Sequence, residues 1–326
     1  MQRNSGRVKI VIAGGGTGGH VTPAIAVHEE IIRRGIDVEF LWIGSYAGIE
    51  RTEASRAGIP FVSIQTGKFR RYFDLKTVTD AGRLPVGFVQ AANQLRKFRP
   101  NVVFSTGGFV SVPTVVASRV FAPVVTHEQT ATVGLANKIN AKFSKSFAVS
   151  YPSTLESANG LHRNIVVTGN PVRATLKTGS AEAARAHFGF DSALPILYVT
   201  GGARGASAIN ERVTSILPQL LDRANIVHQT GARSANPDYD RALQARSALP
   251  EHLQSRYAPR EFVGPELSDL FAGAALVLGR SGAGTIAELA YLGLPAILIP
   301  LPLSGGGEQD RNAALLGEIG AAIVLA

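Results

Sequence analysis

The stretch from Lys9 to Pro23, KIVIAGGGTGGHVTP, constrains the fold more than any other part of the chain. Its apolar run, Ile10 to Ala13, has the composition of a buried strand, and five of the next six residues are glycine. Beyond Pro23 an amphipathic stretch runs to Arg34, which predicts a helix. A strand, a glycine turn and a helix start predict a cradle for an anion. The backbone can approach a ligand closely there, and the free N–H groups at the helix start favour negative charge.

The spacing Gly14-x-Gly16-x-x-Gly19 also satisfies the fingerprint of dinucleotide-binding proteins. That fingerprint needs an acidic residue at the end of the second strand to bind a ribose. The second predicted strand, 37–43, carries its acids at its start, which disfavours a nicotinamide- or flavin-dependent oxidoreductase. This interpretation and a purely structural tight turn stay as alternatives. No Lys-Ser or Lys-Thr follows the glycines, so the P-loop pattern is absent.

The length of 326 residues suggests two domains, and the hydrophobic content of 45% can fill sizeable cores. The chain has no cysteine, which excludes disulfides and thiolate metal sites. No apolar segment follows the polar leader, so we expect no secretory signal. The longest apolar stretch, residues 292–303, is too short to span a bilayer and holds three prolines. These features predict a soluble or peripheral protein.

The net charge of +9 favours acidic partners, which are nucleic acid, anionic lipid or a phosphorylated substrate. No helix-turn-helix, zinc-finger or RNA-binding pattern occurs, and the basic residues do not form a simple tail. We therefore expect no nucleic-acid partner, and the other two classes stay open.

Strand and helix signals alternate along the chain, which predicts two parallel α/β halves. The expected strands are 8–13, 37–43, 60–64, 101–105, 123–126 and 146–150, and, after a restart near 169–173, 195–200, 275–278 and 296–300. A second glycine loop, 201–206, follows the first strand of the second half. The hinge is expected within 165–180. Because ligands bind beyond the carboxyl ends of parallel strands, the two halves would face one cleft.

The loops after these strands carry reactive groups. Ser105–Phe109 repeats the glycine cradle, and His127 and Glu128 follow the strand 123–126. A surface loop needs neither side chain there, although His127 can also be a structural hydrogen bonder. Glu288 is expected in the first turn of a helix after Arg280–Thr285, where it would either accept a ribose diol or cap the helix dipole.

Asp238 and Asp240 form a DxD pair, a known signature of metal–diphosphate binding. The pair lies in a polar stretch and not at a strand end, so we expect solvated surface. No other group of His, Asp and Glu has metal-ligand spacing. We expect no metal site.

Seven motifs occur in the order typical of the MurG transferases: GGGTGGHVTP (14–23), STGGFVSVP (105–113), HEQ (127–129), GNPVR (169–173), GG-x-x-GA (201–206), RSGAGT (280–285) with Glu288, and EQDRNA (308–313). The chain resembles this family over residues 8–325. The family transfers N-acetylglucosamine from UDP-GlcNAc to undecaprenyl-diphosphate-linked N-acetylmuramyl-pentapeptide, which converts lipid I to lipid II for peptidoglycan. A catalytically weak or dead sugar-nucleotide-binding homologue is the non-enzymatic alternative.

The resemblance implies the GT-B fold, with two Rossmann-like domains. Residues 1–167 would form the acceptor and membrane-side domain, and 168–326 the UDP-GlcNAc-binding domain. It also implies inversion by direct displacement, with no cofactor and no obligatory metal. The partners would be UDP-GlcNAc, the lipid-linked acceptor and an anionic membrane surface. The protein would be peripheral on the cytoplasmic face of the bacterial cell membrane.

The resemblance also assigns roles to single residues. His20 is a candidate base or diphosphate ligand, and Glu128 competes for the role of base. The positions that carry over to substrate binding are Thr17, Gly18 and Gly19 beside donor and acceptor, Arg173 near the donor phosphates, Val263 at the uracil through its backbone, Ala283, Gly284 and Thr285 at the diphosphate, Glu288 at the ribose, and Gln309 at the sugar.

Three departures from the family pattern stand out. Thr130 replaces the asparagine that usually contacts the donor sugar, and Ala203-Arg204 replaces Ser-Gln in the second glycine loop. We expect Arg204 to supply the phosphate contact that the serine usually makes. The sequence ends at Ala326, where family members continue, so either it stops short or its C-terminal closure differs.

A basic and apolar stretch lies between Lys68 and Arg99, with eight basic residues against two acids. Leu84, Val86 and Phe88 cluster there around a proline and a glycine, an unusual composition for a plain core helix. The resemblance places the membrane-facing patch here. The alternative is an ordinary helix with a solvated basic face.

Overall fold

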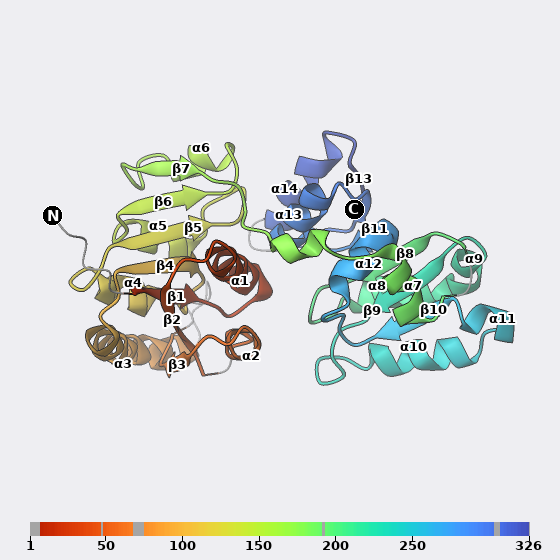
Figure 1. Ribbon diagram of the computed structural model, residues 1–326, viewed down its shortest axis with the longest axis horizontal. Coiled ribbons are helices and arrows are strands. Elements are labelled where there is room, and N and C mark those ends of the chain that lie inside the picture. Colours follow the sequence, from red (N-terminus) through yellow and green to blue (C-terminus); the bar gives the residue numbers. More distant parts are fainter. Residues whose placement is uncertain (1–6, 47, 68–74, 191–192, 303–306, 326) are drawn as a thin grey trace. The chain divides into compact units, whose positions relative to one another are not determined.

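The computed structural model describes residues 7–46, 48–67, 75–190, 193–302 and 307–325, except for the side chains of residues 75–84. The chain divides into two compact units, Met1–Arg173 and Ala174–Ala326, against an expected boundary at 167. Figure 1 shows that each unit is a sheet covered by helices. The predicted fold class, with one parallel sheet in each half, is confirmed.

Unit 1, residues 1–173, contains a seven-stranded parallel sheet in the order β3-β2-β1-β4-β5-β6-β7. Its strands are β1 Val8–Gly14, β2 Val38–Ser45, β3 Phe61–Ile64, β4 Val102–Gly107, β5 Val124–Glu128, β6 Ser146–Val149 and β7 Ile165–Val167. Its helices are α1 Gly18–Arg33, α2 Glu50–Arg56, α3 Leu75–Phe98, α4 Val112–Ser118, α5 Leu135–Ala141 and α6 Thr154–Ala158.

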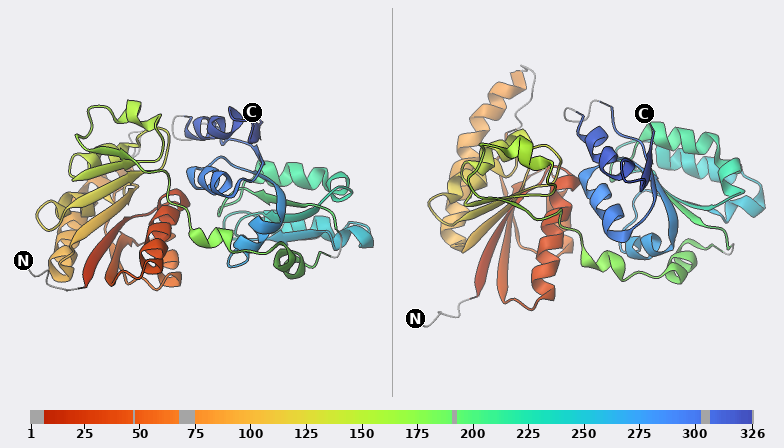
Figure 2. Two further views of the ribbon diagram at one scale, coloured as in Figure 1. Left: turned by 45° about the horizontal axis from the view of Figure 1, so that its top comes forward. Right: turned by 90° about the horizontal axis from the view of Figure 1, so that it is seen from above.

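Alternating residues of the central strand β1 build two cores in unit 1. Ile10 and Ile12 pack with residues of α1 and α2, whereas Val11 and Ala13 pack with residues of α3 and α4. Helices therefore cover both faces of the sheet, as Figure 2 shows. The apolar run from Ile10 to Ala13 reflects burial on both faces, which is typical of a parallel sheet.

Unit 2, residues 174–326, contains a six-stranded parallel sheet in the order β10-β9-β8-β11-β12-β13. Its strands are β8 Ile196–Thr200, β9 Asn225–Gln229, β10 Tyr257–Arg260, β11 Ala274–Gly279, β12 Ala296–Leu298 and β13 Ala322–Val324. Its helices are the 3-10 helix η1 Ala174–Lys177, then α7 Ala181–Phe188, α8 Ser207–Ser215, α9 Leu217–Leu221, α10 Asp238–Ser247, α11 Glu251–Gln254, α12 Leu267–Gly273, α13 Ala283–Leu292 and α14 Glu308–Gly317.

Both sheets have the doubly wound strand order, in which the first strand is central and the order reverses beside it. The reversal lies between β1 and β4 in unit 1 and between β8 and β11 in unit 2. In open sheets of this kind, ligands bind outside the carboxyl ends of the strands at the point of reversal. The topology therefore marks one candidate site in each unit.

Helix α1 begins at Gly18, before Pro23, although the sequence predicted a start after that proline. Proline lacks the N–H that a helix interior needs. Here it lies near the start of the helix, where only the carbonyl four residues earlier, that of Gly19, loses its partner. The earlier start places His20 in the first turn of α1.

The expectation of a solvated Asp238–Asp240 pair was wrong for Asp238. This side chain is buried, and its Oδ2 accepts hydrogen bonds from Ser207 Oγ at 2.7 Å and Asn210 Nδ2 at 2.9 Å. Asp240 is exposed and pairs with Arg233 at 2.9 Å. Asp238 therefore anchors α10 to α8, and only Asp240 belongs to the surface.

Helix α3 continues through Pro85 for 24 residues. Gly87 is explained by a close approach, because a Cβ there would lie 2.0 Å from the carbonyl oxygen of Gln65. Val86, Phe88 and Val89 are 49%, 41% and 57% exposed. Among the described residues, no helix combines the length and apolar character needed to cross a bilayer.

Candidate functional site

In unit 1 the two glycine loops of the carboxyl edge lie against each other. A Cβ at Gly108 would lie 2.6 Å from the carbonyl oxygen of Gly15 and 3.0 Å from His20 Cδ2. Gly108 also has φ +75°, a conformation that other residues rarely adopt. Glycine is therefore required where the loop after β4 passes His20.

The His20 imidazole is held at one nitrogen. Its Nδ1 lies 2.9 Å from the carbonyl oxygen of Thr106 and 3.2 Å from Gln129 Oε1. A carbonyl oxygen can only accept, so Nδ1 carries the hydrogen and donates it. Nε2 has no hydrogen-bond partner among the described residues, and the side chain is half-buried. The ring therefore has a fixed orientation and one free nitrogen.

Glu50 is a site residue that the sequence analysis missed. Its side chain is fully buried at the start of α2. One carboxylate oxygen accepts the N–H of Gly16 at 2.9 Å, and the other accepts the N–H and hydroxyl of Ser45 at 2.9 and 2.6 Å. A Cβ at Gly15 would lie 2.4 Å from the Glu50 carboxyl carbon. The carboxylate therefore fills the inside of the first glycine loop.

Glu128, a candidate base from the sequence, is buried and fully engaged. Its Oε1 accepts from the backbone N–H of Thr130 at 3.1 Å, and its Oε2 accepts from Gly134 N–H and Asn137 Nδ2, both at 3.0 Å. The Thr130 hydroxyl lies 2.9 Å from Oε1 and 2.6 Å from the Thr132 carbonyl. Both side chains are turned into the loop that follows β5.

His127 and Gln129 complete this edge of unit 1. His127 Nε2 lies 2.9 Å from the Gly169 carbonyl, and its Nδ1 lies 3.2 Å from Gln129 Nε2. Burial lowers the pKa of His127 below its ordinary value, so the ring is neutral near pH 7. The structural alternative for His127 fits this geometry, since both of its ring nitrogens are engaged within the protein.

In unit 2, Gln229 ties together the loops of the carboxyl edge. Its Nε2 donates to Thr200 Oγ1 and to the Gly202 carbonyl, both at 3.1 Å. Its Oε1 accepts the N–H of Val263 at 2.8 Å. The backbone N–H of Val263 is therefore engaged within the protein, so the carbonyl is the backbone group left for a base such as uracil.

The N-terminus of α13 follows β11 at the reversal point of unit 2. The helix begins at Ala283 after Gly282, whose carbonyl accepts the N–H of Ile286 at 3.0 Å. Among the described residues, the backbone N–H groups of Gly284 and Thr285 have no hydrogen-bond partner within the chain. Such groups and the helix dipole favour an anion.

Glu288 does not lie in the first turn of α13, contrary to expectation. The helix starts at Ala283, so Glu288 is its sixth residue, and its first turn carries no acidic residue. The attraction of a carboxylate to the helix dipole fades beyond the first turn. The helix-cap interpretation of Glu288 therefore loses its basis.

Arg280 and Ser281 fix the chain just before α13. Arg280 donates to the carbonyls of Ile299 and Pro300 at 3.0 and 2.7 Å, and burial lowers the pKa of Arg280. Ser281 Oγ donates to the carbonyl of Gln309 at 2.7 Å. Gln309 Oε1 in turn accepts the N–H of Leu301 at 2.9 Å. The loop before α13 and the start of α14 are thus joined.

Three other predicted binding residues occupy loops. Ala203 and Arg204 have exposed side chains in the loop between β8 and α8, and the Arg204 carbonyl accepts from Asn236 Nδ2 at 3.0 Å. Arg173 is the last residue of unit 1. Within the described part of the chain, no group of three or more His, Asp or Glu side chains could hold a metal ion.

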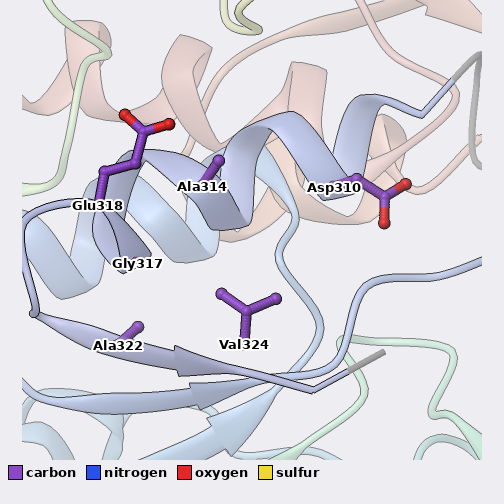
Figure 3. A pocket seen from close by; sticks show the side chains of 6 residues that line it. All are labelled: Asp310, Ala314, Gly317, Glu318, Ala322 and Val324. Carbon is purple, nitrogen blue, oxygen red and sulfur yellow. The ribbon is translucent and has the colours of Figure 1, made fainter.

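A pocket of about 460 Å³ lies between α14 and β13 in unit 2 (Figure 3). It is lined by two carboxylates and small apolar groups: Asp310, Ala314, Gly317, Glu318, Ala322 and Val324. Two carboxylates without a cation disfavour a diphosphate. This pocket is therefore not the donor site that the sequence predicts.

The chain matches family models in both units. The glycosyltransferase family 28 N-terminal domain matches residues 10–149, and the family 28 C-terminal domain matches residues 196–326. The UDP-N-acetylglucosamine–N-acetylmuramyl-(pentapeptide) pyrophosphoryl-undecaprenol N-acetylglucosamine transferase of Treponema pallidum (strain Nichols) is 40% identical over 319 residues, which cover 97% of this chain and 82% of that protein. The transferase of the same name from Clostridium botulinum (strain Hall) is 38% identical over 321 residues, which cover 97% and 86%.

The chain belongs to the MurG family of glycosyltransferases. Among solved structures, Acinetobacter baumannii MurG matches with a TM-score of 0.66 and 24% identity over 98% of this chain and 85% of that chain. A glycosyltransferase of Streptomyces sp. SF2575 matches with a TM-score of 0.61 and 14% identity, covering 98% and 88%. These two likenesses concern the fold, which is GT-B.

Family membership decides between the interpretations that the glycine fingerprint at residues 14–19 allowed. A nicotinamide- or flavin-dependent oxidoreductase is excluded as the family of this chain, although the glycine fingerprint allowed it. Glu50 is the acid that follows β2, but its carboxylate is fully buried against Gly16 and Ser45. It therefore presents no oxygen to a ribose.

Proposed function

We propose that the chain transfers N-acetylglucosamine from UDP-GlcNAc to undecaprenyl-diphosphate-linked N-acetylmuramyl-pentapeptide, converting lipid I to lipid II. The observation that carries this proposal is identity of 38–40% to transferases of this name over nearly the whole chain. We assign the acceptor to unit 1 and the donor to unit 2. The free N–H groups at the start of α13 support the second assignment, because they favour a diphosphate.

His20 is the general base in this proposal. A hydroxyl oxygen of the acceptor sugar attacks C1 of N-acetylglucosamine, and the bond from C1 to the UDP oxygen breaks. UDP leaves with the electron pair of that bond, the hydroxyl proton passes to His20 Nε2, and C1 inverts. The support is that Nδ1 is already committed to Thr106 and Gln129, so Nε2 has the lone pair. General base catalysis contributes about 10²–10⁴ in rate.

Glu128 fits a positioning role better than that of base. Its two oxygens already accept from the backbone of Thr130 and Gly134 and from Asn137, and its side chain is 2% exposed. A base must reach the proton that it removes. The carboxylate instead shapes the loop on which Thr130 replaces the family's asparagine.

In unit 2 we assign the donor diphosphate to Ala283, Gly284 and Thr285 at the start of α13, and the ribose diol to Glu288. Gln309 would bind the sugar, and the carbonyl of Val263 the uracil. Arg204 would bring a cation to the diphosphate from an exposed loop, beside Ala203. Arg173, at the end of unit 1, would approach the same phosphates. Helix N-termini and arginines of this kind stabilise the charge that develops on departing UDP.

The membrane contact is assigned to α3, with the protein peripheral on the cytoplasmic face. Val86, Phe88 and Val89 are exposed on this helix. A cavity of about 540 Å³ near its C-terminal end is lined by Asn93, Arg96, Lys97 and Arg99. Exposed apolar groups beside cations suit an anionic lipid surface. Of the predicted patch, residues 68–74 and the side chain of Leu84 lie outside the described part of the structure.

The direct test measures UDP release from UDP-GlcNAc with and without a short-chain lipid I analogue. We expect release that depends on the acceptor, and a loss of about 10²–10⁴ in kcat for His20→Ala. His252→Ala, at an exposed position on α11, is the matched control and should behave like the parent. Donor binding without turnover would favour the catalytically dead homologue. The replacements at Thr130 and Ala203 would then explain the lost activity.

A further inference from the structure

The donor and the acceptor of each hydrogen bond among His127, Gln129 and His20 can be assigned in only one consistent way. The Gly169 carbonyl can only accept, so His127 Nε2 carries a hydrogen and donates it over 2.9 Å. His127 is neutral because burial lowers its pKa, and its Nδ1 therefore accepts. The donor to Nδ1 is the amide nitrogen of Gln129, 3.2 Å away.

The second amide hydrogen of Gln129 is also engaged. Gln129 Nε2 donates to the His127 carbonyl at 2.9 Å. The amide group therefore cannot flip without losing two hydrogen bonds, those to His127 Nδ1 and to the His127 carbonyl. Its Oε1 consequently faces His20 Nδ1 at 3.2 Å. Gln129 is only 1% exposed and His127 only 2%, so water does not compete for these groups.

We propose that Gln129, oriented by His127, is a positioning residue that fixes His20 as the tautomer with the hydrogen on Nδ1 and the lone pair on Nε2. This inference rests on the proposed role of His20 as base. The two acceptors at Nδ1, the Thr106 carbonyl and Gln129 Oε1, both disfavour the opposite tautomer. An imidazole with the hydrogen on Nε2 would have no lone pair to take the hydroxyl proton there.

The same chain of bonds ends near the boundary between the units. Gly169 has φ +76° and lies four residues before Arg173, where unit 1 ends. The backbone conformation at 169 therefore determines where the acceptor for His127 lies. His20 is thus oriented by the Thr106 carbonyl and, through the side chains of Gln129 and His127, by the Gly169 carbonyl, and not by its own helix alone.

Ring tautomers can be read directly in the full-length protein without turnover. Two-bond ¹H–¹⁵N spectra of histidine-labelled protein should show the Nδ1–H tautomer for His20 and the opposite Nε2–H tautomer for His127. Signals are assigned with His20→Gln and His127→Gln. In Gln129→Met the His20 signals should move toward a tautomer mixture. An Nε2–H tautomer at His20 in the parent, or no change in Gln129→Met, would overturn the proposal.

Kinetics supply a second readout that a merely structural glutamine would not affect. In Gln129→Met we expect kcat to fall about tenfold with an unchanged KM for UDP-GlcNAc. In Gln129→Glu a carboxylate lies next to the Nδ1–H of His20. The acid limb of the pH profile of kcat/KM should therefore shift to higher pH by roughly one unit. Gln90→Met is the control, because Gln90 accepts the N–H of Gln65 on the α3 side of the sheet. Equal effects in Gln90→Met and Gln129→Met would contradict the proposal.

The two proposals fail in different ways. Near-parent turnover in His20→Ala would remove His20 as base but leave the tautomer result intact. If His20→Ala confirms His20 as the base but Gln129→Met leaves the His20 tautomer unchanged, only the positioning role of Gln129 is removed.

Discussion

In unit 1 a buried carboxylate, Glu50, is bonded to the backbone of the glycine loop through Gly16. In unit 2 the corresponding loop is bonded by neutral groups, since Gly202 N–H donates to Thr200 Oγ1 and Gly205 N–H to the Gly202 carbonyl. Both loops follow the first strand of a sheet with the same strand order. One glycine loop is thus bonded to a buried carboxyl side chain, whereas the other is held by a hydroxyl and a backbone carbonyl.

This difference suits the proposed role of His20. Both proposed substrates carry a diphosphate, so a carboxylate inside the first glycine loop disfavours the binding of either diphosphate within that loop. The acceptor side needs a base next to a hydroxyl, and a loop fixed by Glu50 holds the first turn of α1 and its His20. The same sequence pattern therefore has two uses, and the residue that decides between them lies more than 30 positions away at 50.

The largest effect on stability is expected for Glu50→Ala. The change leaves the Gly16 N–H and the Ser45 N–H and hydroxyl buried without partners, which should lower the free energy of unfolding by about 3 kcal/mol. Urea unfolding measures it. Glu53→Ala on the same helix removes only a surface pair with Arg56 and should cost less than about 1 kcal/mol. Equal losses would show that unit 1 does not depend on its internal carboxylate.

The next effect concerns His228 in unit 2, which accepts from the Tyr257 hydroxyl and donates to Asn210 Oδ1. Burial lowers the pKa of His228 to about 4, against about 6.5 in an unfolded chain. Between these values only the unfolded state binds the proton, so stability falls as pH drops from about 6.5 to 4, by up to ~3 kcal/mol. His228→Gln should flatten this dependence.

The control for the pH effect is His252→Gln, at an exposed position on α11. It should keep the parent's dependence of the urea midpoint on pH. An unchanged dependence in His228→Gln would place the acid sensitivity elsewhere, for instance at His127 in unit 1, whose pKa burial also lowers. The pH dependence of stability would then not distinguish unit 2 from unit 1.

A smaller effect is expected for Glu288→Ala. If this carboxylate accepts the ribose diol, UDP-GlcNAc binding should weaken by about 2 kcal/mol, and 2′-deoxy-UDP and UDP should bind the variant alike. Calorimetry measures both. Glu318→Ala, exposed beside the pocket of α14 and β13, is the control. Unchanged donor affinity in Glu288→Ala would remove the ribose assignment.

The fold was largely predictable because its signals are local. The buried runs that form β1 and β8 are continuous and apolar, and each is followed by glycines. Strands β7, β9, β10 and β13 were not predicted. Strand β9 carries Asn225, His228 and Gln229, so it does not resemble a buried strand in composition. Each of these polar groups has a partner in the fold. Sequence periodicity cannot show such partners.

The candidate site was predictable only where a motif marked it. His20 and Glu128 stand in motifs, but their environments depend on residues far away in the sequence: Thr106 and Gln129 for His20, and Asn137 for Glu128. Glu50 stands outside every motif, in a stretch that looks like an ordinary helix start. Its role follows from three glycines that leave room for it, at 15, 44 and 48.

The smallest effect separates the two faces of unit 1. If α3 contacts a membrane, Val86→Glu/Val89→Glu should bind vesicles rich in anionic lipid about tenfold less than the parent. The two apolar contacts are lost, and each basic neighbour contributes only about 1 kcal/mol. Raised salt should weaken the parent's binding as well, because it screens the cations. Ile32→Glu on α1, across the sheet and 51% exposed, is the control and should sediment like the parent. If both variants sediment alike, or neutral vesicles bind as well as anionic ones, α3 is an ordinary surface helix.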